Sequence, residues 1–269
     1  MPLLTADPAA LRRLADRIRL QAVRMVAPHG FGYLGQALSC AETVATLYAT
    51  AYRPARDQLV CSPGHYIIAI FAAAAEAGLI DENDLATYGF DDSTLEAIGT
   101  ERSPAVDLTC GSLALGLSGG VGFALSKRMR GDDDGRVFVL ASDGEMEEGQ
   151  TWEAALFAGH HRLSRLTVLL DANDSQVDAP VSAITTLEPL ASKWASFGWD
   201  VYDVDGHDVV ALHQALIAAV DGDRPSIVIA RTSTRQGLDV LPPDADGHFI
   251  KLPAQLAAEA ISELEARLA

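Results

Sequence analysis

An aspartate and an asparagine follow two apolar segments of the sequence. Asp143 comes just after residues 136–141 (RVFVLA), and Asn173 comes just after residues 166–171 (LTVLLD). A helical pattern from about 147 to 162 separates the two segments, which predicts one strand–helix–strand unit. Because neighbouring parallel strands bring the residues at their carboxyl ends to one crevice, we expect both side chains to face the same ligand.

These side chains offer oxygen ligands for a hard cation. A carboxylate and an amide oxygen suit Mg²⁺, which prefers octahedral coordination and shares its shell with phosphates and water. Gly144 would let the backbone approach a phosphate oxygen closely. The pattern therefore predicts a diphosphate site without a phosphate-binding lysine. An Asp-Gly pair after a strand is equally typical of a plain turn, and Glu148-Gly149 with Asn173 favours the ligand site.

Strands alternate with helices along the chain, which predicts an α/β fold with a parallel sheet and helices on both faces. We expect one domain over residues 1–269, with an irregular loop at 29–35, a capping box at Ser39–Glu42, a solvated turn or a metal site at 132–135, and an irregular segment at 241–250. The expected strands are 57–62, 136–141, 166–171, 199–204 and 226–230, and the expected helices are 7–27, one from about 39, 66–77, 147–162, 209–219 and 253–268.

Composition excludes several classes of protein. The net charge of −17 disfavours nonspecific binding to nucleic acid or to anionic membranes. The apolar segment 67–80 is interrupted by Glu76, so we interpret it as a buried helix and expect no membrane span. The N-terminal sequence lacks the pattern of a secretory signal, which favours a cytoplasmic location. Three widely spaced cysteines, without a CxxC pair, are expected to be buried thiols.

The segment 142–178 (SDGEMEEGQTWEAALFAGHHRLSRLTVLLDANDSQVD) resembles the thiamine diphosphate motif of the transketolase family. Other similar pieces occur in the family's order over nearly the whole chain, at residues 38–48, 56–66, 108–125, 194–208 and 227–237. The resemblance implies a thiamine diphosphate-binding domain of the type that holds the diphosphate and Mg²⁺. It also implies transfer of a two-carbon ketol or acyl unit from a small-molecule donor to an aldehyde or related acceptor.

The resemblance also implies roles for individual residues. Asp143 and Asn173 would ligate Mg²⁺ through their side chains, and Ser175 through its backbone carbonyl. His65 and His248 resemble histidines near the diphosphate and the reacting centre, with an ordinary core or surface histidine as the alternative for each. The positions that would contact the cofactor are His65, Gly111, Leu113, Asp143, Gly144, Asn173, Val177 (against the thiazolium ring) and His248.

In this family the cofactor lies between two domains, and the second domain holds the aminopyrimidine and supplies a glutamate. The present sequence carries no segment that resembles this pyrimidine-binding domain. The resemblance therefore implies a separate C-terminal transketolase-like subunit, in a heterotetramer of two copies of each chain. Glu148 resembles an acidic residue that couples paired active sites, and an ordinary glutamate at a helix N-terminus is the alternative.

Two positions depart from the family's pattern. Tyr33 stands where a histidine is usual, and Thr100 is nearest to a second missing histidine. Because these histidines face the sugar in the family, we expect a non-standard donor or acceptor. Two alternatives remain: a thiamine-dependent 2-oxoacid decarboxylase or acyloin synthase subunit, and a noncatalytic regulatory subunit.

Overall fold

Six parallel strands form the central sheet of the computed structural model, which describes residues 6–243, 245 and 247–269. Most of the strands are short apolar runs, as expected for strands that are covered on both faces, but the edge strand at Asp200–Asp205 is partly exposed. The strand order across the sheet is β3 (Leu108–Cys110), β2 (Gln58–Pro63), β4 (Val137–Ser142), β5 (Leu166–Ala172), β7 (Ser226–Arg231) and β6 (Asp200–Asp205). The predicted α/β class and the parallel sheet are confirmed, and β3 is a strand that the sequence did not predict.

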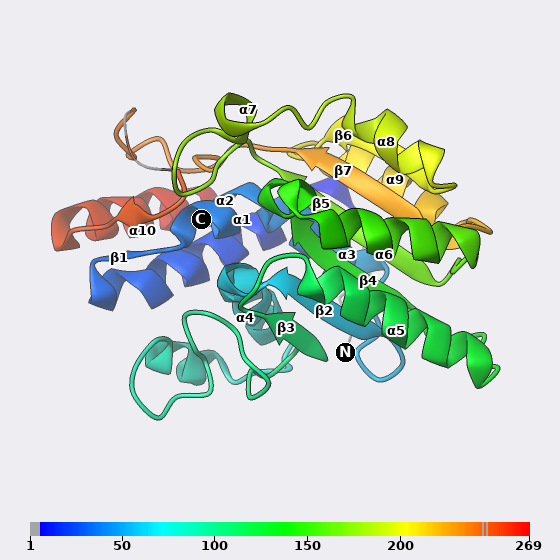
Figure 1. Cartoon of the computed structure of the whole chain (residues 1–269). Helices are drawn as coiled ribbons and strands as arrows, with labels where there is room; N and C mark the ends of the chain where they lie inside the picture. Colours follow the sequence, from blue (N-terminus) through cyan, green and yellow to red (C-terminus); the bar gives the residue numbers. More distant parts are fainter. Residues whose placement is uncertain (1–5, 244, 246) are drawn as a thin grey trace.

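Helices cover both faces of this sheet, and each face has its own apolar core. On one face lie α1 (Pro8–Val26), α2 (Leu34–Ser39), α3 (Ala41–Thr50), α4 (Ile67–Glu76), α9 (Val209–Asp221) and α10 (Ala254–Leu268). The other face carries α5 (Leu115–Met129), α6 (Gly149–His160) and α8 (Leu190–Ser196), with α5 and α6 at the front of Figure 1. Alternate residues of β4 serve the two cores: Phe138 and Leu140 point to one, Val137 and Val139 to the other.

The expected irregular loop at 29–35 is wrong in its middle and at its carboxyl end. Residues Phe31–Gly32 form β1, which pairs antiparallel with β8 (Ile250–Lys251), a strand that begins at the last residue of the other segment expected to be irregular. Helix α2 already begins at Leu34 and contains Gly35. A Cβ at Gly35 would lie 1.8 Å from the carbonyl oxygen of Gly247, so close backbone packing explains this glycine. Residues 1–5, 244 and 246 of the predicted segments lie outside the described residues.

The predicted capping box at Ser39–Glu42 is also wrong. Cys40 is the N-cap of α3, and its side chain makes no capping bond. The Ser39 hydroxyl instead donates to Asp171 in the core, and Glu42 accepts from Arg19 of α1. Tertiary hydrogen bonds have thus replaced the local pattern. Of the three thiols, Cys40 and Cys61 are buried as expected, whereas Cys110 is half-buried.

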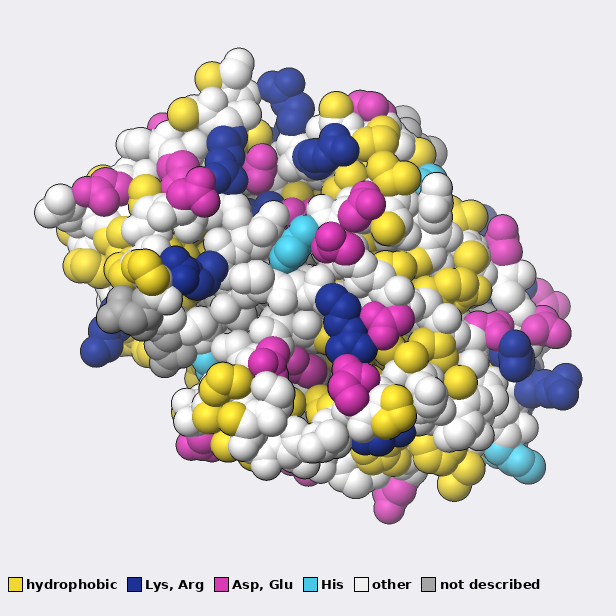
Figure 2. Space-filling model, turned by 90° about the horizontal axis from the view of Figure 1, so that it is seen from above, with side chains coloured by type: hydrophobic (Ala, Val, Ile, Leu, Met, Phe, Trp, Pro, Cys, Tyr) yellow, Lys and Arg dark blue, Asp and Glu magenta, His cyan; other side chains and the backbone are white. Residues whose placement is uncertain are grey.

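The charged surface has no basic stripe among the described residues on the face shown in Figure 2, where Lys and Arg side chains are scattered among Asp and Glu. In the described part of the chain, no helix is long and apolar enough to cross a membrane. The segment that begins at Ile67 is instead the core helix α4, as predicted, with all but its last two residues buried.

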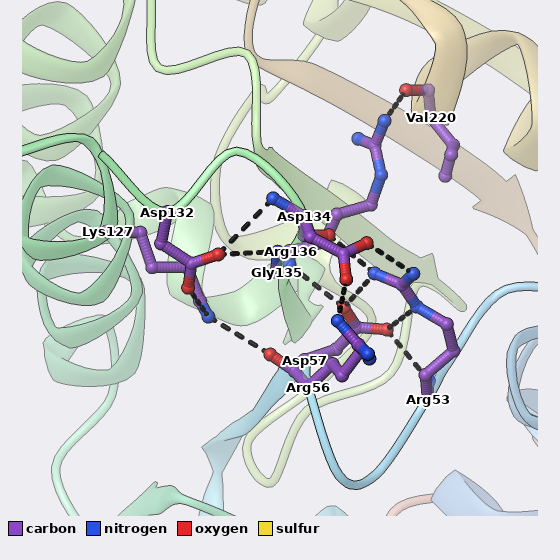
Figure 3. Close-up of polar contacts among 9 residues, drawn as sticks. All are labelled: Arg53, Arg56, Asp57, Lys127, Asp132, Asp134, Gly135, Arg136 and Val220. Carbon is purple, nitrogen blue, oxygen red and sulfur yellow. Dashed lines mark hydrogen bonds and ion pairs between the residues drawn. The ribbon is translucent and has the colours of Figure 1, made fainter. Parts of the chain in front are cut away.

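An ionic network joins the residues that directly precede β2 and β4, at the amino-terminal end of the sheet (Figure 3). The Asp57 side chain is fully buried and accepts hydrogen bonds from the backbone and guanidinium nitrogens of Arg53 and from the backbone nitrogen of Arg136, at 2.8–3.1 Å. In the predicted turn at 132–135, Asp132 pairs with the buried Lys127, and Asp134 pairs with Arg53 and Arg56. The turn is largely exposed to solvent at 132–134, as predicted, and the carboxylates of Asp132 and Asp134 are engaged in these ion pairs.

We expect Asp57→Ala to lower the free energy of unfolding by about 2–4 kcal/mol, because it removes a buried carboxylate that accepts several charge-assisted hydrogen bonds. Urea denaturation followed by circular dichroism measures this change. Asp133→Ala is the matched control, because Asp133 is exposed in the neighbouring turn. Equal stability of the Asp57→Ala protein and the wild type would contradict the role assigned to the network.

Candidate functional site

Asp143 and Asn173 lie at the carboxyl end of the sheet, as predicted. Strands β4 and β5 pair in register with Ser142 opposite Asp171, so the chain leaves both strands at the same level. One carboxylate oxygen of Asp143 accepts from the backbone nitrogen of Gly144 at 2.9 Å, and the other accepts from that of Asp174 at 2.6 Å. The turn after β4 and the turn after β5 are therefore tied together through Asp143.

Asp143 begins a short 3₁₀ helix, η4 (Asp143–Glu147), which Ser142 and Glu145 cap reciprocally. The buried Glu145 carboxylate also accepts from the Ser62 hydroxyl of β2 and from the backbone nitrogen of Ala114 at 2.7 Å. It therefore fixes three segments around the site. Sequence reasoning missed Glu145, although the Ser-x-x-Glu pattern at 142–145 is the signal of a capping box.

A cavity of about 390 Å³ opens beside these turns, a volume within the range of small-molecule sites. All but one of the predicted site residues line it: His65, Gly111, Leu113, Asp143, Gly144, Glu148, Ser175, Val177 and His248. Asn173 lies just behind the wall, 7 % exposed, and its Oδ1 accepts from the backbone nitrogen of Ser175 at 2.9 Å. Residues far apart in the sequence are thus brought to one site, and none of the predicted residues lies elsewhere.

The two predicted histidines are neighbours in this cavity. The ring centroids of His65 and His248 are 5.2 Å apart, and the Tyr33 ring lies within 5.6 Å of each. The side-chain amide nitrogen of the buried Gln36 is 2.9 Å from Nδ1 of His248 and fixes the orientation of that ring. Sequence reasoning missed Gln36, because only the fold brings α2 against the segment before β8.

Thr100, expected nearest to a missing substrate-facing histidine, is not among the described residues that line the cavity. Its hydroxyl donates to the carboxylate of Glu96, and the wall of the cavity is formed by Ile98 instead. The hydrogen bond from the backbone nitrogen of Gly99 to the carbonyl oxygen of Gly64 anchors this segment beside η2 (Gly64–Tyr66). In this region the wall of the cavity therefore includes Tyr33 and Ile98 and not Thr100.

Electrostatics at the cavity favour a cation. Burial, reinforced by the carboxylate of Asp171, raises the pKa of Asp143 to about 7. The described lining residues include no Lys or Arg but do include Glu147, Glu148 and Asp178. Burial, reinforced by His248, lowers the pKa of His65 to about 4, so its imidazole is neutral at neutral pH. A divalent cation beside Asp143 would supply the missing positive charge.

The donor set fits Mg²⁺ bound together with a phosphate ligand. In the described part of the chain, no group of three or more His, Cys, Asp and Glu side chains could hold a metal alone. Asp143 and Asn173 would supply two side-chain oxygens, which would leave room for phosphate oxygens and water, as Mg²⁺ usually requires. Added Cβ atoms at Gly111 and Gly144 would meet no heavy atom nearer than 3.6 Å, so a ligand can approach the backbone there.

Comparison with known proteins identifies the family of this chain. Residues 10–268 match the family model described as the thiamine diphosphate-binding domain of transketolase. The chain belongs to the transketolase family. The transketolase family protein y4mO of Sinorhizobium fredii is 40% identical to it, with 96% of each chain covered. The 6-deoxy-6-sulfo-D-fructose transketolase subunit SqwG of a Clostridium species is 34% identical, with 95% of this chain and 96% of that subunit covered.

A solved structure shows the same fold within a longer chain. Transketolase from Campylobacter jejuni superposes with a TM-score of 0.86 at 24% identity, over 96% of this chain and 43% of that one. This transketolase-family chain therefore corresponds in fold to less than half of the Campylobacter chain. It matches SqwG and y4mO over almost their full lengths.

We expect His65→Gln to make the protein less sensitive to acid. The pKa of His65 in the folded state is about 4, below the usual 6.5, so the unfolded chain takes up a proton first as the pH falls. The stability that His65 contributes is present above about pH 6.5 and is lost towards pH 4. Thermal unfolding midpoints of the wild type should thus fall faster over this window than those of the variant.

His160→Gln is the matched control, because His160 is exposed on α6. It should follow the wild type at every pH. Parallel pH profiles for His65→Gln and the wild type would show that burial does not disfavour the charged form of His65.

Proposed function

We propose that this chain is the diphosphate- and Mg²⁺-binding subunit of a thiamine diphosphate-dependent transketolase that transfers a two-carbon ketol unit. The observation that carries the proposal is the cavity at the carboxyl end of the sheet, where Asp143, Gly144, His65 and His248 meet. Family membership over residues 10–268 supports the same proposal. Neither alternative, the 2-oxoacid decarboxylase or the noncatalytic subunit, is favoured by these matches.

In this proposal, Mg²⁺ is held by side-chain oxygens of Asp143 and Asn173 and by the backbone carbonyl of Ser175. Gly144 allows the backbone to approach the diphosphate. His65, uncharged at neutral pH, can donate or accept a hydrogen bond without adding charge beside the ligand. Val177, 73 % exposed at the cavity, offers an apolar contact for the thiazolium ring.

In this proposal, the remaining lining residues bind and orient the cofactor and the substrate. Gly111 and Leu113 form the wall next to the start of α5, and His248 is held in place by Gln36. Thiamine diphosphate, when bound, supplies the nucleophilic carbon that accepts the two-carbon unit. The protein's part is to place that carbon, keep water away from it and offer hydrogen bonds to the substrate.

We infer that residues 1–269 act as a single diphosphate-binding domain and that the pyrimidine-binding domain belongs to a partner chain. The full-length match to SqwG, whose name describes a subunit, supports this division. A heterotetramer with two copies of each chain would place two complete sites in one assembly. Glu148 is exposed at the edge of the cavity, where it could contact the partner and couple the two sites.

The substrate of the assembled enzyme is also part of the proposal. Tyr33 stands where a histidine is usual, and Ile98 lines the cavity two residues before Thr100, in the segment that lacks the second histidine, so this wall offers a phenol and an alkyl group. The described lining residues include no Lys or Arg, so this wall offers no cationic side chain to a phosphate or sulfonate on the substrate. We therefore propose a donor or acceptor other than the usual sugar phosphates.

The test of the function is an assay of ketol transfer by the chain reconstituted with a candidate partner, such as a pyrimidine-domain protein encoded beside it. Asp143→Ala should lower kcat/KM by about 10³-fold, since a metal ion contributes several kcal/mol to such reactions. Asp133→Ala removes the same charge at the far end of the sheet and should leave the rate unchanged. Release of carbon dioxide from pyruvate, without ketol transfer, would instead identify a decarboxylase.

A second experiment tests the substrate proposal. The wild-type assembly should transfer ketol units poorly from xylulose 5-phosphate to ribose 5-phosphate, and Tyr33→His with Ile98→His should raise kcat/KM for this pair about tenfold, the worth of one good hydrogen bond. Phe31→His, outside the cavity, is the control. Efficient transfer between these sugars by the wild type would rule out a non-standard substrate.

A further inference from the structure

Asp171, the residue before the last of β5, is a fully buried carboxylate to which the mechanism assigns no role. Donors from four side chains surround it. Oδ2 accepts from the Ser39 hydroxyl at 2.5 Å, from the Tyr66 hydroxyl at 2.9 Å and from the Asn173 amide at 2.8 Å, and Oδ1 accepts from the Thr232 hydroxyl. An unpaired buried charge is costly, so these hydrogen bonds are what keep the carboxylate in the core.

One of these contacts decides which way a proposed metal ligand faces. The Asn173 amide has an oxygen end and an NH₂ end, and only the oxygen can bind a cation. Because the carboxylate of Asp171 accepts hydrogen bonds, the NH₂ end of Asn173 must face it. The amide oxygen is thereby directed to the opposite side, where it accepts from the backbone nitrogen of Ser175 in the loop that lines the cavity.

We propose that Asp171 is a positioning residue that holds Asn173 with its oxygen turned towards the metal. This inference rests on the proposed role of Asn173 as a Mg²⁺ ligand. Asp171 does not line the cavity, so it would act through Asn173 and not as a ligand itself. Outer partners of this kind orient metal ligands in many proteins, and their loss typically costs 10–100-fold in affinity.

The surroundings of Asp171 show why the orientation is firmly held. Ser39 ends α2, Tyr66 ends η2 and Thr232 follows β7, so three separate segments fix the carboxylate. Tyr66 and Ser39 also lie within 3.0 and 3.3 Å of the Asn173 amide nitrogen. Rotation of the Asn173 amide would place its oxygen against the carboxylate of Asp171, which is electrostatically unfavourable.

A reciprocal exchange tests the contact. Asp171→Asn alone places two amides side by side and no longer selects the orientation of Asn173. Asn173→Asp alone places two carboxylates in contact. The exchange of both residues restores one donor and one acceptor across the contact and returns an oxygen to the metal side, while the hydroxyls of Ser39 and Tyr66 can rotate to suit.

The measurement is the affinity for Mn²⁺, a hard cation that prefers the same ligands as Mg²⁺, by electron paramagnetic resonance with thiamine diphosphate and the partner chain present. We expect each single variant to bind about 10–100-fold more weakly than the wild type and the exchange to bind within about tenfold of it. Thr167→Val is the control, because it removes a buried hydroxyl from the same strand, away from the site.

The decisive comparison is the exchange against Asn173→Asp, so it holds even if Asp171→Asn does not fold. If Asp171 had a purely structural role, the exchange would bind Mn²⁺ no more tightly than Asn173→Asp, and that result would overturn the proposal. If the wild type itself did not bind Mn²⁺ under these conditions, the proposed function would be rejected, and the positioning role with it. The two failures are therefore distinguishable.

Discussion

Strands β4 and β5 pair in parallel register, and the candidate site depends on that pairing. With Ser142 level with Asp171, the two turns that follow begin side by side, and the Asp143 carboxylate joins them by accepting from the backbone nitrogen of Asp174. The apolar residues of both strands are buried on both faces, so the register cannot slip without moving core side chains into the wrong layer. The packing of the sheet thus sets the distance between the two proposed metal ligands.

Buried hydrogen bonds hold the floor of the cavity in place, whereas the residues at its mouth are exposed to solvent. Buried carboxylates at 145 and 171 are surrounded by donors from several segments, whereas Val177 and Glu148 at the rim are exposed. Such an arrangement suits a half-site: the part that would hold the metal and the diphosphate is rigid, and the part that would face a second chain remains uncovered. Burial and the nearby carboxylate of Asp171 disfavour the charged form of Asp143 and so raise its pKa, and a bound cation would favour that charged form.

Much of this could be predicted from the sequence because the signals are local. Apolar runs of strand length predicted β4, β5 and β7, and the spacing of Asp143 and Asn173 placed both at one edge of the sheet. The failures arose where distant residues decide the structure. Ser39 has a capping pattern but bonds to Asp171, Gly35 lies inside a helix that packs closely against the backbone of Gly247, and Ile98 occupies the wall expected for Thr100. None of these contacts leaves a trace in neighbouring residues.

The central claim is that this chain holds half of a thiamine diphosphate site. Calorimetric titration of thiamine diphosphate in the presence of Mg²⁺, into the chain alone and into its mixture with the candidate partner, tests the claim most directly. The account predicts tight binding that requires both chains and is lost in the mixture containing Asp143→Ala. Binding of equal strength without the partner, or no binding in either setting, would contradict it.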